Sequence, residues 1–227
     1  MNTVDLETQS LRSLNQSLHD LIGTTEKTKW TVLNPKGAHA IAAGIDSPMD
    51  ITIDGSAGYF CASMNKQADV HIKGSAGPGL GENMISGTIT VDGDASQNAG
   101  ATAHGGLLNI KGNASARTGI SMKGVDIVVH GSIGHMAAFM GQSGNLVVLG
   151  DAGEALGDSC YEARFFVRGE VKSLGADCEK KEMRPEHIEF LKDILERTGA
   201  DAKPEEFTRY GSARKLYNFD VDNASAY

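Results

Sequence analysis

Residues 108–150 decide the fold, and they read LNIKGNASARTGISMKGVDIVVHGSIGHMAAFMGQSGNLVVLG. Three apolar triplets in this stretch begin at Leu108, Ile127 and Leu146, at a constant 19-residue spacing, and a glycine follows shortly after each triplet. A 19-residue period that is kept six times without an insertion is typical of a repeat protein. The marker glycines of the whole repeat are Gly55, Gly74, Gly93, Gly112, Gly131, Gly150 and Gly169.

Each apolar triplet predicts a short strand. Apolar, largely β-branched residues at alternate positions place the first and third side chains of a triplet on the same side of the chain. A strand this short is not stable alone, so successive copies have to pair in parallel along one axis. The sequence therefore predicts an all-β core, a parallel β-helix of about seven coils, which at about 4.8 Å per coil is a rod roughly 34 Å long.

Small residues recur at two further positions of the repeat, where we expect the coil to turn its corners. Two residues after the marker glycines stand Ala57, Ala76, Ala95, Ala114, Ile133, Ala152 and Val171, and seven residues after them stand Ala62, Gly81, Gly100, Gly119, Ala138, Gly157 and Ala176.

The 19-residue period also excludes two other classes of solenoid. Hexapeptide arrays need a period that is a multiple of six, and calcium-binding nonapeptide arrays need a multiple of nine.

Segments on either side of the repeat predict helices that cap the open ends of the coil. An amphipathic helix ends at Gly23, and a second helix is expected between Pro185 and Gly199. Trp30–Leu33 is interpreted as a degenerate leading coil, one 19-residue repeat ahead of the first full one. The apolar positions of these flanks are Leu11, Leu14, Leu18 and Leu21, then Ile188, Leu191, Ile194 and Leu195, and, as candidate anchors of a tail, Phe207, Tyr210, Leu216, Tyr217 and Phe219.

The chain is thus expected to have three regions. Residues 1–29 hold the N-terminal amphipathic helix, residues 30–180 the parallel β-helix, and residues 181–227 the C-terminal helix and a tail that wraps the rod or a partner.

Charge and cysteine content exclude several classes of function. The 21 Lys and Arg against 29 Asp and Glu give a formal net charge of -8 at pH 7, which opposes binding to nucleic acid. No apolar run is long enough to span a membrane, and no secretory signal begins the chain. Three cysteines cannot form a paired disulfide framework, so we expect a protein of the reducing cytoplasm.

The residue types that carry chemistry are scattered over the repeat. Cys61 lies five coils from Cys160, so Cys61, Cys160 and Cys178 cannot share one iron–sulfur cluster and are interpreted as small buried thiols. The segment Gly77–Gly81 resembles a phosphate-binding loop only in composition, because no helix follows it. Histidines fall in different columns and coils, which is unlike a zinc site, and they are His71, His104, His130 and His135. We therefore predict no catalytic, cofactor-binding or metal-binding residue in this chain.

The middle residue of each strand should point outward, and this outer column changes character along the rod. It is polar at first and apolar at its C-terminal end, which makes Val128, Val147 and Phe166 a candidate interface. We expect either a partner subunit or the chain's own C-terminal tail to cover these residues, and exposure above half for Val147 and Phe166 would contradict this. The polar members are Thr52, His71, Thr90 and Asn109.

The glycine grid also carries a family resemblance. The runs Gly112–Gly124, Ile127–Ser132 and Gly150–Ala163 are similar to the Gly-x-Gly-x-Gly domain at the C-terminal end of the glutamate synthase large chain, over about residues 30 to 180. The resemblance implies a right-handed β-helix that acts as a structural spacer between an amidotransferase domain and an FMN-bearing synthase domain, without catalytic residues of its own.

A stand-alone form of this domain with flanking helices and a stretch such as Val167–Cys178 resembles the middle subunit of N-methylglutamate synthase. That resemblance implies a scaffold between an amidotransferase-like subunit and an FMN-binding subunit, the latter with an iron–sulfur cluster. The implied reaction joins methylamine to glutamate and releases ammonia, in a higher hetero-oligomer.

An alternative class contains a similar β-helix. Formylmethanofuran dehydrogenase and formyltransferase–hydrolase complexes, which transfer one-carbon units, also have a glycine-grid subunit. The leading and trailing helices favour the glutamate synthase side, and a free-standing binding rod without an attached enzyme is the third alternative.

Overall fold

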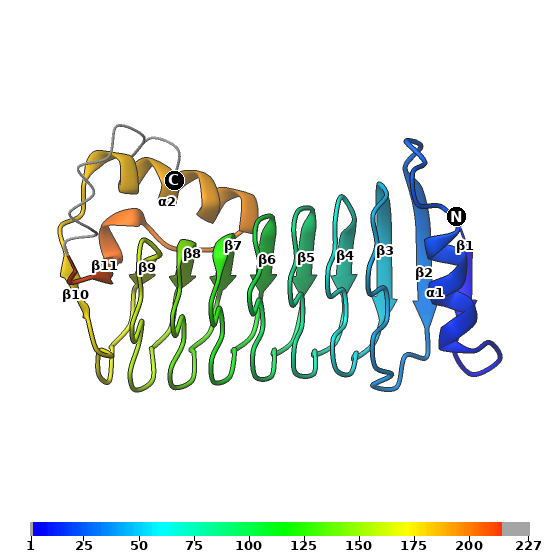
Figure 1. The fold of residues 1–227 in the computed structure, drawn as a ribbon, viewed down its shortest axis with the longest axis horizontal. Coiled ribbons are helices and arrows are strands. Elements are labelled where there is room, and N and C mark those ends of the chain that lie inside the picture. Colours follow the sequence, from blue (N-terminus) through cyan, green and yellow to red (C-terminus); the bar gives the residue numbers. More distant parts are fainter. Residues whose placement is uncertain (1, 215–227) are drawn as a thin grey trace.

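The chain folds into a parallel β-solenoid, whose coils stack along the long axis in Figure 1. The computed structural model describes residues 2–214. Strands from successive coils form one continuous parallel sheet along the rod. Their bounds are β2 (Thr28–Leu33), β3 (Met49–Asp54), β4 (Asp69–Ile72), β5 (Thr88–Val91), β6 (Leu107–Ile110), β7 (Lys123–Val129), β8 (Ser143–Val148) and β9 (Arg164–Val167).

Strand register confirms the 19-residue coil. Ile51 pairs with Val70, Val70 with Ile89, and the same offset continues to the pair of Leu146 with Phe165. The first and third side chains of each triplet point into the coil and are buried, so that the core runs the length of the rod. The fold class predicted from the repeat is therefore correct.

The marker glycines are required because neighbouring coils approach closely there. A Cβ at Gly112 would stand 2.4 Å from Asp94 Oδ1 and 2.7 Å from the carbonyl oxygen of Gly93. Asp94 Oδ1 is placed there because it accepts a hydrogen bond of 2.7 Å from the backbone N–H of Asn113 in the next coil. A side chain at the marker position would therefore break the contact between coils.

This contact recurs from coil to coil, and we call it the oxygen ladder. In each step, the side-chain oxygen of the residue after a marker glycine accepts the backbone N–H of its equivalent in the next coil, at 2.7 to 3.1 Å. The ladder satisfies backbone donors at a corner where no strand partner is present. Its acceptors are Ser56, Ser75, Asp94, Asn113, Ser132 and Asp151.

The small residues seven positions after the markers, from Ala62 to Gly157, lie at corners with positive φ, as expected, whereas in the last coil the positive φ is at Asp177 and not at Ala176. The φ angle is 50° at Ala62 and 68° at Gly100. Glycine is favoured at this corner also for lack of space, since a Cβ at Gly100 would stand 2.7 Å from Ile127 Cδ1 inside the coil.

The leading coil differs from the prediction. Trp30–Leu33 pairs residue by residue with Ile51–Asp54, whereas a 19-residue repeat would place Trp30 opposite Met49, so the predicted register was wrong. The number of residues between paired positions is 21 for Trp30 and Ile51 and 20 for the bridge between Asp46 and Lys66. Between β3 and β4 it reaches the regular value of 19. One extra residue therefore lies before this bridge and one after it, in corners that contact the N-terminal cap.

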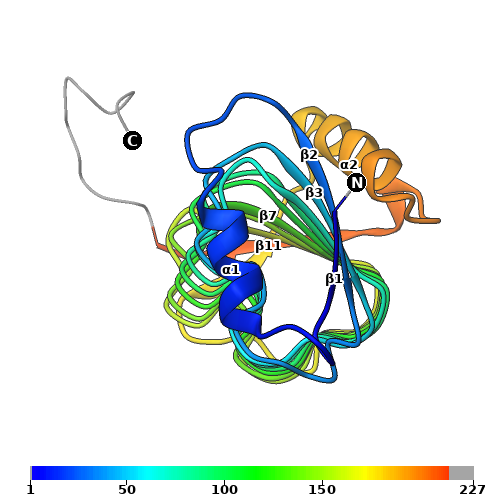
Figure 2. The same ribbon diagram turned by 90° about the vertical axis from the view of Figure 1, so that its right-hand side faces the viewer.

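Helix α1 (Leu11–His19) closes the N-terminal end of the solenoid, and Figure 2 shows it lying across that end. Its buried residues Leu14 and Leu18 pack onto the core of the first coil. Asn15 fastens the helix to this coil, because its side chain donates to Ala40 O at 2.9 Å and accepts from Ala42 N at 3.0 Å. The predicted N-terminal cap is therefore present.

Strand β1 (Asn2–Asp5) is an element that the repeat did not indicate. It pairs in parallel with β2, with Asn2 opposite Trp30, and so adds an edge strand to the solenoid sheet. Residues 1–29 therefore contribute a strand as well as the expected helix.

The C-terminal region adds two antiparallel strands to the sheet. β10 (Cys178–Lys181) leaves the last coil, and β11 (Thr208–Ser212) returns to lie between β9 and β10, antiparallel to both. Tyr210 of β11 packs against the solenoid core, as its interpretation as an anchor suggests. The expected anchors Leu216, Tyr217 and Phe219 lie outside the described residues.

Helix α2 (Pro185–Thr198) does not lie across the open end of the coil. It runs along the outer face of the strands, above β6 to β9 in Figure 1, and a short 3₁₀ helix, η1 (Pro204–Glu206), leads from it to β11. Its apolar stripe follows the apolar part of the outer column, which explains why the helix lies on the side of the rod and not over its end.

Candidate interface on the outer face of the strands

Residues 2–214 cover one half of the outer face of the sheet and leave the other half uncovered. In the covered half, Val128 and Phe166 are 0% exposed and Val147 is 1% exposed. Leu191, Ile194 and Leu195 of α2, together with Phe207, pack on this column. Of the two covers expected for the candidate interface, the structure shows the chain's own C-terminal segment, so these residues are not a free surface for a partner.

The N-terminal half of α2 is held to this face by aromatic contacts. The ring of Phe166 lies 5.6 Å from that of Phe190 and 6.0 Å from that of His187, between ring centroids. The guanidinium of Arg164 lies 5.7 Å from the Phe190 ring centroid, in a cation–π contact.

A polar cluster holds the C-terminal end of α2. Lys111 Nζ donates to the carbonyl oxygen of Thr198, and Asn109 Nδ2 lies 3.5 Å from the same atom. A lysine at this position complements the partial negative charge of a helix C-terminus. The cover therefore ends above β6, where the outer column changes from apolar to polar.

His130 belongs to the same cluster and is kept neutral by it. Its Nε2 lies 3.0 Å from Asn109 Oδ1 and 3.4 Å from Lys111 Nζ. Burial and the neighbouring Lys111 ammonium lower the pKa of His130 from 6.5 to about 4. The 19-residue period stacks Lys111 beside His130, but the repeat could not show that the C-terminal end of α2 also lies over this pair, because α2 stands outside the repeat.

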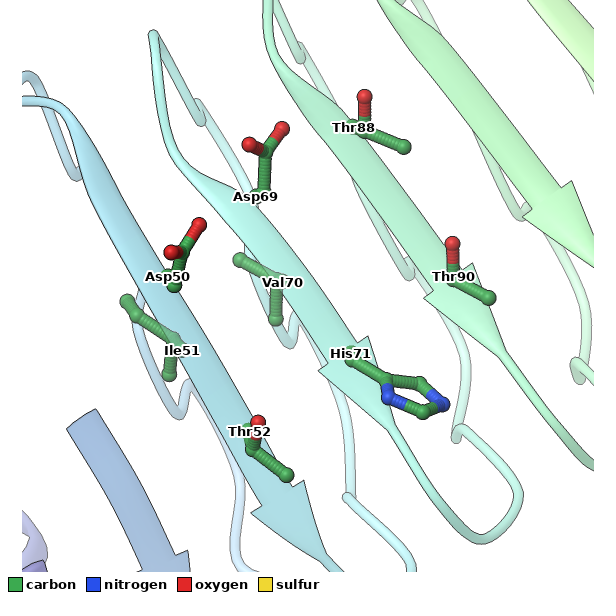
Figure 3. A pocket seen from close by; sticks show the side chains of 8 residues that line it. All are labelled: Asp50, Ile51, Thr52, Asp69, Val70, His71, Thr88 and Thr90. Atoms are coloured by element: carbon green, nitrogen blue, oxygen red, sulfur yellow. The ribbon is translucent and has the colours of Figure 1, made fainter. Parts of the chain in front are cut away.

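The uncovered half of the face lies on β3, β4 and β5, and Figure 3 shows its side chains. Thr52, His71 and Thr90 stand side by side from neighbouring strands, and a second row, Asp50, Asp69 and Thr88, runs parallel to them. These side chains line a shallow hollow on the sheet. All are partly exposed, so this polar surface is available for contact.

Charges on the uncovered half are paired with one another. Lys27 Nζ lies 2.6 Å from Asp50 Oδ1 and 2.9 Å from Asp69 Oδ2, and these hydrogen bonds raise the pKa of Lys27 to about 12. His71 Nε2 lies 2.9 Å from Asp92 Oδ1. The face therefore presents hydroxyl groups and paired charges, which suit a wet, hydrogen-bonded contact better than an apolar one.

The other candidate residues lie where the repeat places them. Cys61 and Cys160 are buried and Cys178 is half-buried, and burial raises the pKa of the Cys61 thiol to about 12. Gly77–Gly81 forms part of an ordinary coil, in which Leu80 points into the core. Nowhere in residues 2–214 do three His, Cys, Asp or Glu side chains gather into a group that could hold a metal ion. Neither helix of this part of the chain is long and apolar enough to cross a bilayer.

These features define a parallel β-solenoid of glycine-marked coils, with one half of its strand face covered by its own helix. The family model of the GXGXG motif matches residues 22–198, so the chain belongs to the GXGXG motif family, the glutamate synthase-like domain that the glycine grid resembles. The chain is also 62% identical over 228 residues to Protein GlxC of Rhizobium meliloti (strain 1021), an alignment that covers all of both proteins.

Proposed function

We propose that this chain is a non-catalytic scaffold subunit of a glutamate synthase-like multi-subunit enzyme. In its most specific form, the proposal is N-methylglutamate synthase, which converts methylamine and L-glutamate to N-methyl-L-glutamate and ammonia. Membership of the GXGXG motif family and the similarity to Protein GlxC over the whole chain support the general statement.

The partners proposed are an amidotransferase-like subunit and an FMN-binding subunit, which would also carry an iron–sulfur cluster. The β-solenoid would hold the two at a constant separation, because its coils are joined along the whole rod by the sheet and by the oxygen ladder. The reacting groups would then belong to the partners.

The observation that carries this proposal is the division of the strand face. The inner face of the solenoid sheet is filled by the core, and α2 covers the outer face over β6 to β9. Over β3 to β5 the described residues leave the row of Thr52, His71 and Thr90 partly exposed. We therefore assign the uncovered half as a surface where a partner subunit binds.

Co-purification from the native host tests the scaffold role. A tagged copy of the chain expressed at its natural level should elute with a flavoprotein and an amidotransferase-like chain, and the eluate should show flavin absorbance. The chain purified alone should show neither flavin absorbance nor turnover of methylamine and glutamate. A molybdenum or tungsten enzyme or a metal-dependent hydrolase in the eluate would instead support the one-carbon-transfer alternative, and elution alone would refute the scaffold role.

A pair of variants tests the assigned surface. Thr52→Arg places a long charged side chain in the middle of the uncovered half and should reduce recovery of a partner subunit at least tenfold. Gln97→Arg adds the same side chain at an exposed coil corner, away from the strands, and should leave recovery unchanged. Equal recovery with both variants, when both fold normally by circular dichroism, would place the partner elsewhere.

A further inference from the structure

Two cysteines meet at the C-terminal end of the solenoid. Cys160 is buried in the last regular coil, and Cys178 is half-buried at the beginning of β10. At this end the coil is one residue shorter than the regular repeat, because Leu156 forms a parallel bridge with Leu174. Cys160 and Cys178 are separated along the chain by the same interval as these two leucines, so they occupy equivalent positions in neighbouring coils.

Local hydrogen bonds show that the two cysteines end equivalent turns. The N–H of Cys160 donates to Gly157 O at 3.1 Å, and the N–H of Cys178 donates to Gly175 O at 3.3 Å. The sulfur of Cys178 lies over the turn that contains Cys160, since a Cβ at Gly157 would stand 2.9 Å from Cys178 Sγ. The interaction between the two thiols lowers the pKa of Cys160 and raises that of Cys178.

This stacking suits a disulfide bond. Equivalent residues in neighbouring parallel coils lie about 4.8 Å apart, and disulfide-bonded cysteines have Cα atoms roughly 4.4–6.8 Å apart. The Cβ atoms have to approach slightly more than ordinary stacking gives, which makes such a bond strained and easily reduced. Cys178 begins β10, which pairs with β11 and not with another coil of the parallel sheet.

We propose that Cys160 and Cys178 form a reversible redox pair, oxidised by peroxide to a disulfide that links the last coil to β10. Cys178 is the accessible member, and Cys160 is the buried partner beside it. Cys61 does not take part, because it is buried several coils away and its pKa is raised to about 12.

The oxidation balances with hydrogen peroxide as the two-electron acceptor. One cysteine thiolate attacks a peroxide oxygen, the O–O bond breaks, and a sulfenic acid and hydroxide form. The second thiolate attacks the sulfenic sulfur, the S–S bond forms, and a second hydroxide leaves. The two protons released by the thiols convert both hydroxides to water.

The bond would strengthen the attachment of the C-terminal segment that covers the strand face. Asp177, next to Cys178, already accepts a hydrogen bond from the N–H of Ala213 at 2.7 Å and forms an ion pair with Arg214, so β11 is tied to the same turn. A disulfide at this turn closes a short loop and restricts the unfolded chain, which stabilises the folded state. The oxidation state would thus set how firmly β10 and β11 close the rod.

Peptide mapping of the full-length protein tests the proposal. Reduced protein is treated with hydrogen peroxide, alkylated and digested without reductant. We expect one linked peptide pair that contains Cys160 and Cys178, an intact mass lower by two hydrogen atoms, and recovery of both thiols with dithiothreitol. The midpoint of thermal unfolding should rise on oxidation by roughly 5–10 °C.

Two serine variants separate the pair from the third cysteine. Cys178→Ser should remove the linked peptide and the shift of the midpoint, whereas Cys61→Ser should keep both. A linkage through Cys61, a disulfide between two chains, sulfinic acid at Cys178 without a linkage, or thiols that react only after unfolding would each overturn the proposal. The mapping of the unmodified chain decides the question even if a variant folds poorly.

Discussion

At the marker glycines from Gly74 to Gly169 a side-chain oxygen of the preceding coil occupies the space where a Cβ would be. Asp94 Oδ1 is one such atom, and the same arrangement repeats along the oxygen ladder. A marker glycine and the acceptor of the preceding coil therefore act together, since the missing side chain makes room for the hydrogen bond that joins the two coils. The acceptor column could have been found from the sequence, because Ser, Asp or Asn follows every marker glycine from Gly55 to Gly150.

Removing one acceptor of the oxygen ladder should weaken the solenoid. Asp94→Ala leaves the N–H of Asn113 without its acceptor and should lower the free energy of unfolding by about 1 kcal/mol. Asp94→Asn keeps a side-chain oxygen and should recover most of the loss. Urea unfolding followed by circular dichroism measures the difference, and equal midpoints for the alanine variant and the native chain would show that the ladder contributes nothing.

The depressed pKa of His130 predicts a pH dependence of stability. An unfolded histidine takes up a proton below pH 6.5, whereas folded His130 does so only near pH 4. Within this window the unfolded state binds more protons, so the free energy of unfolding falls as the pH falls from 6.5 to about 4.

His130→Gln, which has no titrating group, isolates this contribution. Between pH 7 and pH 4.5 the native chain should lose more stability than the variant, as measured by urea unfolding at each pH. Parallel stability curves for the two proteins would show that His130 titrates normally in the folded state.

At the scale of elements, α2 joins the structure through one apolar stripe, aromatic contacts of its N-terminal half and a polar cluster at its C-terminal end. Its stripe lies on the outer column of β7 to β9, and Lys111 binds its C-terminal carbonyl group. The helix therefore depends on tertiary contacts, as most helices of this length do.

Truncating the stripe should release the helix from the strand face. Leu191 is 0% exposed, so Leu191→Ala should lower the free energy of unfolding by about 2–5 kcal/mol. Amide hydrogens of α2 should then exchange faster than those of the inner strands. Lys192→Ala, at an exposed position of the same helix, is the matched control and should change neither quantity by much. Unchanged exchange in α2 of the leucine variant would contradict the packing described.

At the scale of the whole molecule, the rod is closed differently at its two ends. α1 lies across the first coil, whereas the antiparallel strand β11 meets the last parallel strand at the other end. Open ends of a solenoid expose core and unpaired strand edges, and these promote association. We therefore expect both closures to limit the association of rods end to end.

A charge under α1 should open the N-terminal end. Leu18 is 0% exposed, so Leu18→Asp places a carboxylate among the core residues of the first coil and should destabilise the cap. Size-exclusion chromatography with light scattering should then show oligomers. Ser13→Asp, on the exposed side of the same helix, should remain like the native chain. A variant at Leu18 that elutes as the native chain does, with α1 still protected from proteolysis, would show that the cap is dispensable.

The sequence by itself determined the solenoid, the length of its regular coils, which side chains face inward, and the apolar end of the outer column. It could do so because a repeat shows one local pattern many times, and the pairing of equivalent residues follows from the period. Features that do not recur with the 19-residue period were decided only by the tertiary structure. These are the pairing of β1 with β2, the longer leading coil, and the position of α2 on the strand face instead of over the end of the rod. The uncovered half of that face and the contact of the C-terminal end of α2 with Lys111 belong to the same group. Each depends on which segments come together in space, and a single occurrence leaves no periodic trace in the chain, whereas the near alignment of Cys160 with Cys178 and of Lys111 with His130 follows from the repeat.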